Sequence, residues 1–300
     1  MKRTYIVSDL HGSGEVYDSI MGYLENISLI YDTELYINGD LIDRGLDSFR
    51  MLQDVKNRIE INNNFKINYL GGNHELLMYQ AFLERNPNGT FPIFCDWLLN
   101  GGYLIEGELE ELSEEKNLEF KEFIGNLEIY KRLPELIDDN EVLLVHAAAP
   151  KTVLDNCDLK INNNNWDVEK AVWTRKGDYW NTSIGKEGYI TIIGHTPVTA
   201  KEGFIYDKEE KVLNIDGGCA VYGLGMFECS HVPIVEITDN KLNILVFNHD
   251  NEIVDGYYYS DNEIHKMNDL ELDNHRMFID HSLDNKGEEY RKLIKEFNKI

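Results

Sequence analysis

Short β-prone runs alternate with amphipathic stretches through the first third of the chain. The runs that predict strands are residues 4–8, 34–38 and 65–70. The stretches whose apolar residues recur at the helical period are residues 14–27, 46–59 and 74–85. Repetition of strand, loop and helix predicts a largely parallel sheet with crossover helices.

The pattern changes between about residues 92 and 133, where residues 108–130 are acidic and favour helix without a central strand. We expect a helical insertion there. Strand-like runs return at residues 141–145, 189–193 and 212–215, and residues 232–259 alternate β-prone runs with turn signals, as in an antiparallel meander. We therefore expect a catalytic domain over residues 1–260 and a C-terminal extension over residues 261–300, with a polar helix at 286–300.

Polar residues suited to metal binding or proton transfer follow the predicted strands. They are Asp9 and His11, Asp40, Asp43 and Arg44, Asn73 and His74, His146, and His195. Ligands of parallel α/β sheets bind beyond the carboxyl ends of the strands, so we expect these side chains to meet. Carboxylate, imidazole and amide ligands together suit Mn, Fe or Zn, and a carboxylate can bridge two cations that act on a phosphate ester.

The composition is that of a globular protein, but the charge is unusual. Hydrophobic residues make up 42% of the 300 residues and charged residues 28%, while the net charge is −25. This acidity argues against stable binding to nucleic acid, which draws on many Lys and Arg contacts to phosphate. A phosphorylated substrate remains compatible with it, because bound dications can reverse the local field.

The cysteines suggest no disulfide framework. Cys95, Cys157, Cys219 and Cys229 form no Cys-x-x-Cys pair, so we expect reduced, mostly structural thiols. The N-terminus offers too few apolar residues for a signal peptide, and no apolar run approaches the length of a membrane span. The expected location is the cytoplasm, without membrane partners.

The order of the motifs resembles that of calcineurin-like metallophosphoesterases. Asp-Leu-His-Gly occupies residues 9–12, Gly-Asp-Leu-Ile-Asp-Arg-Gly residues 39–45 and Gly-Asn-His-Glu residues 72–75, and His146 and Gly194-His195 follow. The chain is most similar to the bacterial branch of the phosphoprotein phosphatase family, over roughly residues 5–220. The resemblance implies a four-layer α/β/β/α sandwich with a helical insertion and a β-rich C-terminal segment.

The resemblance also implies two divalent metal ions, with manganese the first choice and iron or zinc the alternatives. The residues implied as ligands are Asp9 and His11 for the first ion, Asp40 as the bridge, and Asn73, His146 and His195 for the second ion. A hydroxide activated by both ions would then attack phosphorus directly.

The remaining implied roles belong to acid catalysis and phosphate binding. His74 would protonate the leaving oxygen and Asp43 would orient it, although Asp43 could instead cap the helix predicted at 46–59. Arg44 would grip the phosphate, together with Asn73 and His74. Arg175, in Val-Trp-Thr-Arg, resembles the second phosphate-binding arginine of such enzymes.

Two smaller features affect the pocket. Ser8 stands where many relatives have glycine, which is tolerable if the backbone there is not at positive φ. Trp166, Trp173 and Trp180 could be substrate platforms, but we interpret them as buried packing residues.

The motifs take the form they have in protein serine/threonine phosphatases, so a phosphorylated protein or small phosphoester is the expected substrate. Two other hydrolases remain open: one that cleaves dinucleoside polyphosphates of the diadenosine tetraphosphate type, and one that cleaves cyclic nucleotides or other phosphodiesters. A catalytically silent scaffold with this fold is the alternative from a different class, and the complete ligand set argues against it.

Overall fold

The computed structural model describes residues 2–61, 64–84, 92–149, 159–163, 166–176, 183–219, 231–248 and 252–278. The helix predicted at 286–300 and residues Trp180, Cys157 and Cys229 lie outside these ranges. Of the described cysteines, Cys95 is an exposed free thiol and Cys219 a buried one.

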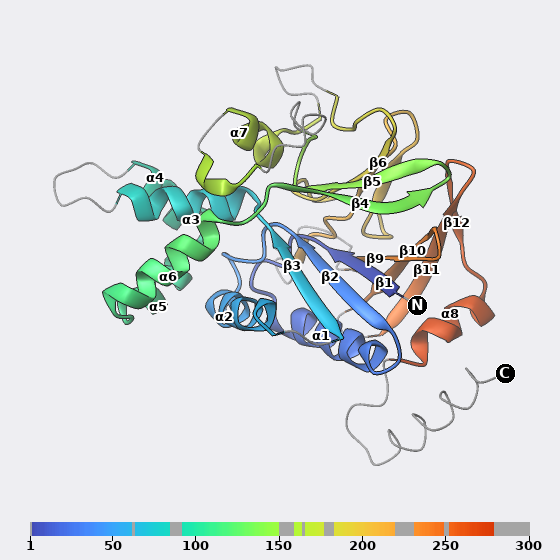
Figure 1. Cartoon of the computed structure of the whole chain (residues 1–300), viewed down its shortest axis with the longest axis horizontal. Helices are drawn as coiled ribbons and strands as arrows, with labels where there is room; N and C mark the ends of the chain where they lie inside the picture. The colour runs from blue at the N-terminus through green and yellow to red at the C-terminus, as the bar shows by residue number, and fades with distance from the viewer. Residues whose placement is uncertain are drawn as a thin grey trace, which may run out of the picture.

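The larger of two sheets has seven strands in the order β12-β11-β10-β9-β1-β2-β3 (Figure 1). Its strands are β1 (Lys2–Val7), β2 (Asp32–Asn38), β3 (Phe65–Leu70), β9 (Val232–Thr238), β10 (Lys241–Phe247), β11 (Ile253–Ser260) and β12 (Glu263–Lys266). The first three are parallel, and β9 to β12 form the expected antiparallel meander, which joins the sheet where β9 pairs with β1.

The smaller sheet has five strands in the order β4-β5-β6-β8-β7. Its strands are β4 (Tyr130–Ile137), β5 (Asn140–Val145), β6 (Tyr189–Ile193), β7 (Ile205–Asp207) and β8 (Val212–Asn214). The predicted strands β5, β6 and β8 are parallel, whereas β4 and β7 are antiparallel edge strands that the sequence pattern did not indicate. The helical insertion therefore ends before Tyr130 rather than near residue 133.

Helices cover the larger sheet and form a lobe beside it (Figure 1). They are α1 (Gly14–Ser28), α2 (Ser48–Ile59), α3 (Asn73–Glu84), α4 (Pro92–Trp97), η1 (Leu98–Gly102), α5 (Tyr103–Glu110), α6 (Glu114–Gly125), η3 (Ile161–Asn163), α7 (Trp166–Trp173) and α8 (Asp269–Arg276). The insertion comprises α4, η1, α5 and α6. In the described residues, no helix combines the length and apolar character needed to cross a bilayer.

The two sheets pack face to face around a shared hydrophobic core. Ile6 and Tyr36 of the larger sheet contribute to the same buried cluster as Val142, Ile190 and Leu213 of the smaller one. A second cluster lies between the larger sheet and the helices. This mixed α/β architecture, with a helical insertion and a β-rich C-terminal segment, confirms the fold class expected from the sequence.

A buried amide ties the sheets together where the polar loops begin. Asn38, at the end of β2, donates from Nδ2 to the carbonyl of Val145 (3.0 Å) and of Ile192 (3.3 Å) in the smaller sheet. These three strand ends lead directly into the loops that carry Asp40, His146 and residue 195. Asn38 therefore fixes the spacing of those loops.

A buried carboxylate holds β9 against β1. Glu236 is fully buried; its Oε1 accepts hydrogen bonds from Arg3 Nη1 (2.9 Å) and Tyr5 OH (2.7 Å), and its Oε2 accepts one from Asn243 (2.9 Å). The guanidinium of Arg3 also lies 3.9 Å from the centroid of the Tyr31 ring. Removing the negative charge would leave the arginine without a counter-ion in a largely buried position.

We expect Glu236→Gln to lower the free energy of unfolding by about 3 kcal/mol, because breaking a buried ion pair leaves an uncompensated charge. Urea denaturation measures the change. Arg50→Ala is the control, since Arg50 pairs with the exposed carboxylates of Asp18 and Asp47 and should cost less than about 1 kcal/mol. Comparable losses in the two variants would contradict the buried-pair interpretation.

Candidate active site

The loops that follow the strands hold many of the expected site residues in an unusual backbone conformation. Those with φ between 44° and 70° are Asp9, His11, Asp40, Asp43, Arg44 and His195. Left-handed backbone is uncommon outside glycine, costs on the order of 1 kcal/mol per residue and tends to gather at functional sites. Ser8 does not have a positive φ, so the backbone at this position tolerates serine where many relatives have glycine.

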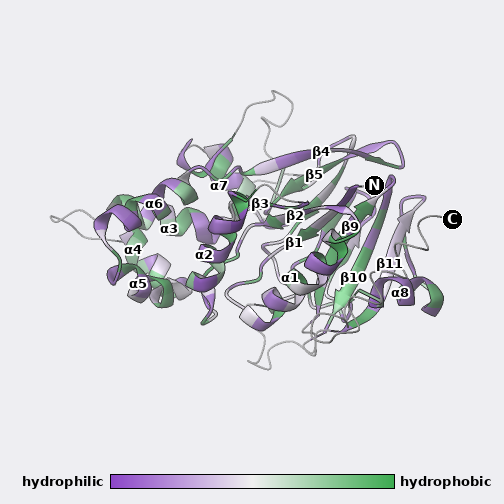
Figure 2. Ribbon diagram, turned by 60° about the horizontal axis from the view of Figure 1, so that its bottom comes forward, coloured by the Kyte–Doolittle hydropathy of each residue, from purple (hydrophilic) through white to green (hydrophobic). Residues whose placement is uncertain are grey.

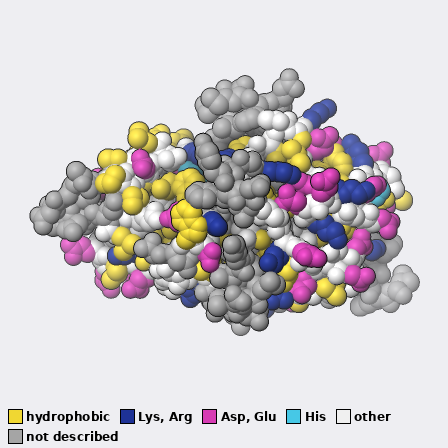
Figure 3. Space-filling model, turned by 90° about the horizontal axis from the view of Figure 1, so that it is seen from above, with side chains coloured by type: hydrophobic (Ala, Val, Ile, Leu, Met, Phe, Trp, Pro, Cys, Tyr) yellow, Lys and Arg dark blue, Asp and Glu magenta, His cyan; other side chains and the backbone are white. Residues whose placement is uncertain are grey.

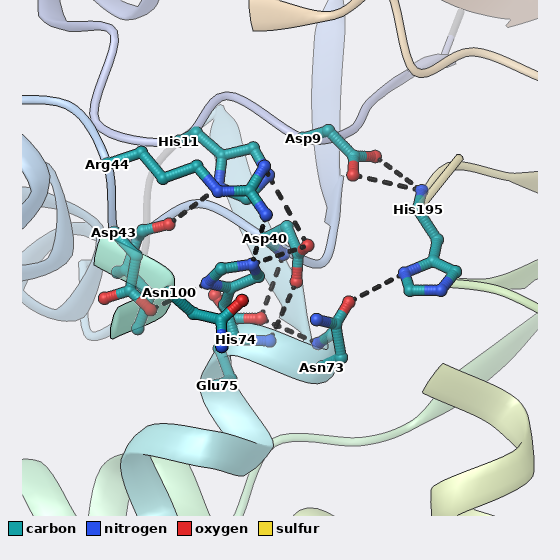
Figure 4. A network of polar contacts seen from close by, with 12 residues as sticks. Asp9, His11, Asp40, Asp43, Arg44, Asn73, His74, Glu75, Asn100 and His195 are labelled. Atoms are coloured by element: carbon teal, nitrogen blue, oxygen red, sulfur yellow. Dashed lines mark hydrogen bonds and ion pairs between the residues drawn. The ribbon is translucent and has the colours of Figure 1, made fainter. Parts of the chain in front are cut away.

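Asp40 occupies the centre of the site, and its carboxylate lies near three imidazoles, of which His11 and His74 are labelled in Figure 4. Its Oδ2 lies 3.3 Å from Nε2 of His146, 3.5 Å from Nε2 of His11 and 3.9 Å from Nε2 of His74. Asp40 belongs to two groups of potential ligands, one with His11 and His74 and the other with His146 and His195. Within each group, the ligand atoms all lie within 4.8 Å of one another. Asp40 therefore has the position that a bridging carboxylate requires.

Backbone carbonyls select which nitrogen each histidine offers. Nδ1 of His11 lies 3.0 Å from the carbonyl of Ile42, and Nδ1 of His146 lies 2.9 Å from that of Asn38. A carbonyl only accepts, so these Nδ1 atoms carry a proton, and Nε2 is the atom through which each ring would bind a metal. His195 is reversed: its Nε2 faces the carbonyl of Trp173 at 3.1 Å, which leaves Nδ1 as the ligand atom.

Asn73 joins the second group, whereas Asp9 lies to one side. The Oδ1 atom of Asn73 is 2.8 Å from Nδ1 of His195 and 3.1 Å from Nε2 of His146, so three potential ligand atoms converge. The carboxylate of Asp9 accepts from the backbone N–H of His195 (3.0 and 3.1 Å) and from the Ser8 hydroxyl. Asp9 belongs to neither of the two His/Asp groups.

The carboxylates of the centre favour positive charge at His146, whereas burial dominates at two other histidines: it lowers the pKa of His195 to about 3 and that of His11 well below its usual range. Burial opposes protonation of His146, yet Asp40 and Asp9 raise its pKa to about 10. Burial likewise opposes ionisation of Asp40, but His146, His74 and His11 hold its pKa well below the usual range. An imidazole must be unprotonated to bind a metal, and the carboxylate, imidazole and amide donors gathered here together fit divalent metals.

His74 and Asp43 form a buried hydrogen-bonded pair. Nδ1 of His74 lies 2.7 Å from Oδ2 of Asp43, and both side chains are almost completely inaccessible to solvent. Burial lowers the pKa of His74, but Asp40 and Asp43 outweigh it and raise the pKa above its ordinary value. Asp43 does not cap the following helix, because α2 begins at Ser48 and is preceded by Asp47.

The two arginines differ in how they meet the site. Nη2 of Arg44 lies 3.0 Å from Nε2 of His74, and its Nη1 lies 3.3 Å from Nε2 of His11, so the guanidinium points into the centre (Figure 4). Arg175 is at the rim, where its Nη1 donates to Oγ1 of Thr196 (3.2 Å), next to His195.

Aromatic residues around the site depart from the sequence interpretation. Trp166 and Trp173 are not buried packing residues: they are 55% and 36% exposed on α7. The Trp173 ring lies edge-on to His195, with centroids 5.9 Å apart. Figure 3 shows exposed hydrophobic side chains gathered on the side of the molecule that carries the insertion and α7. Trp97 is buried and contacts Asp43, a role that sequence reasoning did not assign.

Glu75 is a second residue whose function the motif did not reveal. Its buried carboxylate accepts backbone hydrogen bonds from Asp40 (2.9 Å), Leu41 (3.1 Å) and Gly72 (2.7 Å), and a fourth from Tyr69 OH (2.6 Å). It therefore fixes the loop that carries the central carboxylate against the start of α3.

We expect Glu75→Gln to weaken metal binding by about 10- to 100-fold, because supporting partners of metal ligands contribute effects of that size. The NH2 group of the glutamine amide would face backbone N–H groups that now donate hydrogen bonds to the carboxylate of Glu75. Isothermal titration with Mn²⁺ measures the change. Glu25→Gln, an exposed change at a residue paired with Arg58, is the control. Unchanged affinity in the Glu75 variant would contradict the role assigned to this carboxylate.

Comparison with known proteins agrees with the geometry. Residues 2–231 match the family described as calcineurin-like phosphoesterase. A search of curated protein sequences found no match.

Several solved structures are similar in fold. A cold-active protein-tyrosine phosphatase from Shewanella sp. is 14% identical, with 89% of this chain and 81% of that chain covered and a TM-score of 0.48. A protein provisionally assigned as a diadenosine tetraphosphatase is 16% identical, with coverages of 81% and 93% and a TM-score of 0.48. A protein serine/threonine phosphatase from Saccharomyces cerevisiae is 14% identical, with coverages of 82% and 79% and a TM-score of 0.48.

The family match covers most of the chain, including the loops in which histidine and aspartate side chains are placed to bind metal ions. The chain belongs to the calcineurin-like phosphoesterase family, whose members are metallophosphoesterases.

Proposed function

We propose that this phosphoesterase is a phosphomonoesterase whose substrates are proteins phosphorylated on serine or threonine. The observation that carries the proposal is the buried His74–Asp43 pair, in which the second ring nitrogen of His74, Nε2, faces Arg44. A serine or threonine alkoxide is strongly basic and leaves slowly unless it is protonated, so its hydrolysis gains most from a positioned acid.

The proposed metal ligands are Asp9, His11, Asp40, Asn73, His146 and His195. Two divalent cations bound there, manganese by preference and iron or zinc as alternatives, would neutralise phosphoryl oxygens and make water nucleophilic near neutral pH. Asp40 would be shared between the ions, as its central position suggests.

His74 and Arg44 would act together on the substrate. When Nε2 of His74 carries a proton, it and Nη2 of Arg44 are both donors only 3.0 Å apart. An ester or phosphoryl oxygen close to both nitrogens would accept from each and relieve that conflict. We propose that Arg44 holds the phosphate while His74 donates to the leaving oxygen. Arg175 would bind the phosphate from the opposite rim, beside Thr196.

Hydrolysis of a dinucleoside polyphosphate is the second candidate. The exposed Trp173 ring beside His195 favours it, because an aromatic face can stack on a nucleobase. Cleavage of an anhydride, however, releases a weakly basic phosphate that needs little protonation. The hydrogen-bonded pair of His74 and Asp43, called the acid pair below, is therefore better suited to an ester with a basic leaving group.

Turnover of a phosphoserine peptide and of diadenosine tetraphosphate, measured side by side in Mn²⁺-supplemented buffer, tests the proposal. We expect the higher kcat/KM for the peptide, and loss of both activities in the Asp40→Asn variant, which controls for contaminating enzymes. Faster cleavage of the tetraphosphate would overturn the substrate assignment. A 2′,3′-cyclic nucleotide included in the same series would reveal a phosphodiesterase, and no turnover by metallated protein would indicate a silent scaffold.

A further inference from the structure

The helical insertion reaches the acid pair through one buried tryptophan. Trp97, the last residue of α4, is 1% exposed, and its Nε1–H points at the carboxylate of Asp43, 3.2 Å from Oδ1 and 3.1 Å from Oδ2. The same carboxylate accepts from Nδ1 of His74 at 2.7 Å. Asp43 thus lies between an indole donor from the insertion and the imidazole that faces the substrate.

Two glycines allow the insertion to approach so closely. A Cβ on Gly102 would lie 2.3 Å from the Trp97 indole. Gly101 has φ of 106°, a Cβ there would lie 2.6 Å from the backbone nitrogen of Arg44, and its carbonyl accepts the Arg44 N–H at 3.2 Å. The insertion therefore contacts both the side chain of Asp43 and the left-handed backbone of the next residue.

The indole contact has a consequence for proton transfer. A fully buried carboxylate with only one side-chain donor keeps unpaired lone pairs and can change its rotamer to reach another donor. A second donor from the rigid ring of Trp97 restrains Asp43 so that Oδ2 continues to face His74. The direction of the His74 ring, and hence of its Nε2, depends on that restraint.

We propose that Trp97 is a positioning residue for His74, the proton donor. The helical insertion would then take part in catalysis and not only border the site. The inference rests on the proposed role of His74 as the acid. It predicts that the indole N–H matters most for substrates whose leaving group must be protonated.

The variant that tests it is Trp97→Phe, which keeps an aromatic ring and removes the donor. We expect kcat/KM for a phosphoserine peptide to fall by about tenfold relative to that for p-nitrophenyl phosphate, the size expected for one hydrogen bond to a charged group. Phe94→Leu is the matched control, because the Phe94 ring contacts Trp97 (centroids 6.1 Å apart) without donating to Asp43. It should reduce stability without changing the ratio.

Two further measurements separate positioning from structural damage. The indole N–H resonance of Trp97 is identified in ¹H–¹⁵N spectra as the one that disappears in Trp97→Phe, and its chemical shift should change in Asp43→Asn. The amount of bound metal, measured by mass spectrometry, should stay at the wild-type level in Trp97→Phe. In the His74→Asn background, Trp97→Phe should no longer change the ratio of the two substrates.

An unchanged ratio in Trp97→Phe, or an equal change in Phe94→Leu, would overturn the inference while leaving the proposed function intact. An indole resonance that does not respond to Asp43→Asn would also overturn it. If His74→Asn itself slows both substrates equally, the fault lies with the proposed acid and not with Trp97.

Discussion

Asp40→Asn is expected to lower phosphoesterase turnover by at least about 10³-fold, because charge stabilisation by metal ions supplies several kcal/mol at the transition state. Asp40 is the carboxylate common to both groups of ligand atoms. The surrounding histidines keep it ionised despite its burial. Asparagine has nearly the same shape but no charge, and its amide would place hydrogens near the imidazole nitrogens.

Metal content distinguishes this prediction from simple unfolding. We expect the variant to retain the thermal stability of the metal-free wild-type protein, yet to bind less than one Mn²⁺ per chain at concentrations that fill both sites of the wild type. Asp18→Asn, an exposed change at a residue paired with Arg50, controls for the loss of one charge. An Asp40 variant that keeps two ions and wild-type turnover would exclude the bridging role.

The sequence allowed the prediction of those parts of the fold that follow from regular periodicity. The parallel strands β1, β2 and β3 are short β-prone runs with a polar loop at each carboxyl end, and the candidate ligand residues lie in those loops. In contrast, β4 begins Tyr-Lys-Arg and contains Pro134, and Figure 2 shows hydrophilic residues along it. It is an edge strand held by pairing with β5, so no hydrophobic pattern indicated it.

The sequence indicated the residue types of the candidate site, but not the contacts that support them. Asp40 and His74 stand out in the sequence because the proposed metal binding and proton transfer need those side chains. Trp97 lies 54 residues from its partner Asp43, and Asn38 lies 107 residues from Val145, so only the folded structure brings them together. The choice of Nδ1 on His195 likewise depends on a carbonyl 22 residues away.

Hydrogen bonds from neighbouring elements hold the left-handed backbone of the site loops in place. Arg44 keeps a left-handed backbone while its N–H is bound by the insertion, and Asp40 keeps one while its N–H is bound by Glu75. Each contact compensates a conformation that aims a side chain at the centre. The insertion and α3 thereby stabilise the geometry that the strand ends alone would not hold.

His74→Asn separates acid catalysis from metal binding. We expect hydrolysis of a phosphoserine peptide to slow by about 10²–10⁴-fold, the range for general acid catalysis, with a much smaller effect on p-nitrophenyl phosphate. The nitrophenolate is weakly basic and departs without a proton, whereas the serine alkoxide does not. Asparagine can still donate a hydrogen bond toward Asp43, but it cannot deliver a proton from Nε2.

The measurement is kcat/KM for both substrates, together with metal content. Metal content should remain near the wild-type value, because backbone carbonyls, and not His74, orient the rings of His11, His146 and His195. His265→Asn, on β12, is the control for loss of an imidazole. Equal slowing of both substrates would rule out His74 as the acid, and parallel loss of metal would make it a ligand of the group that includes His11 and Asp40.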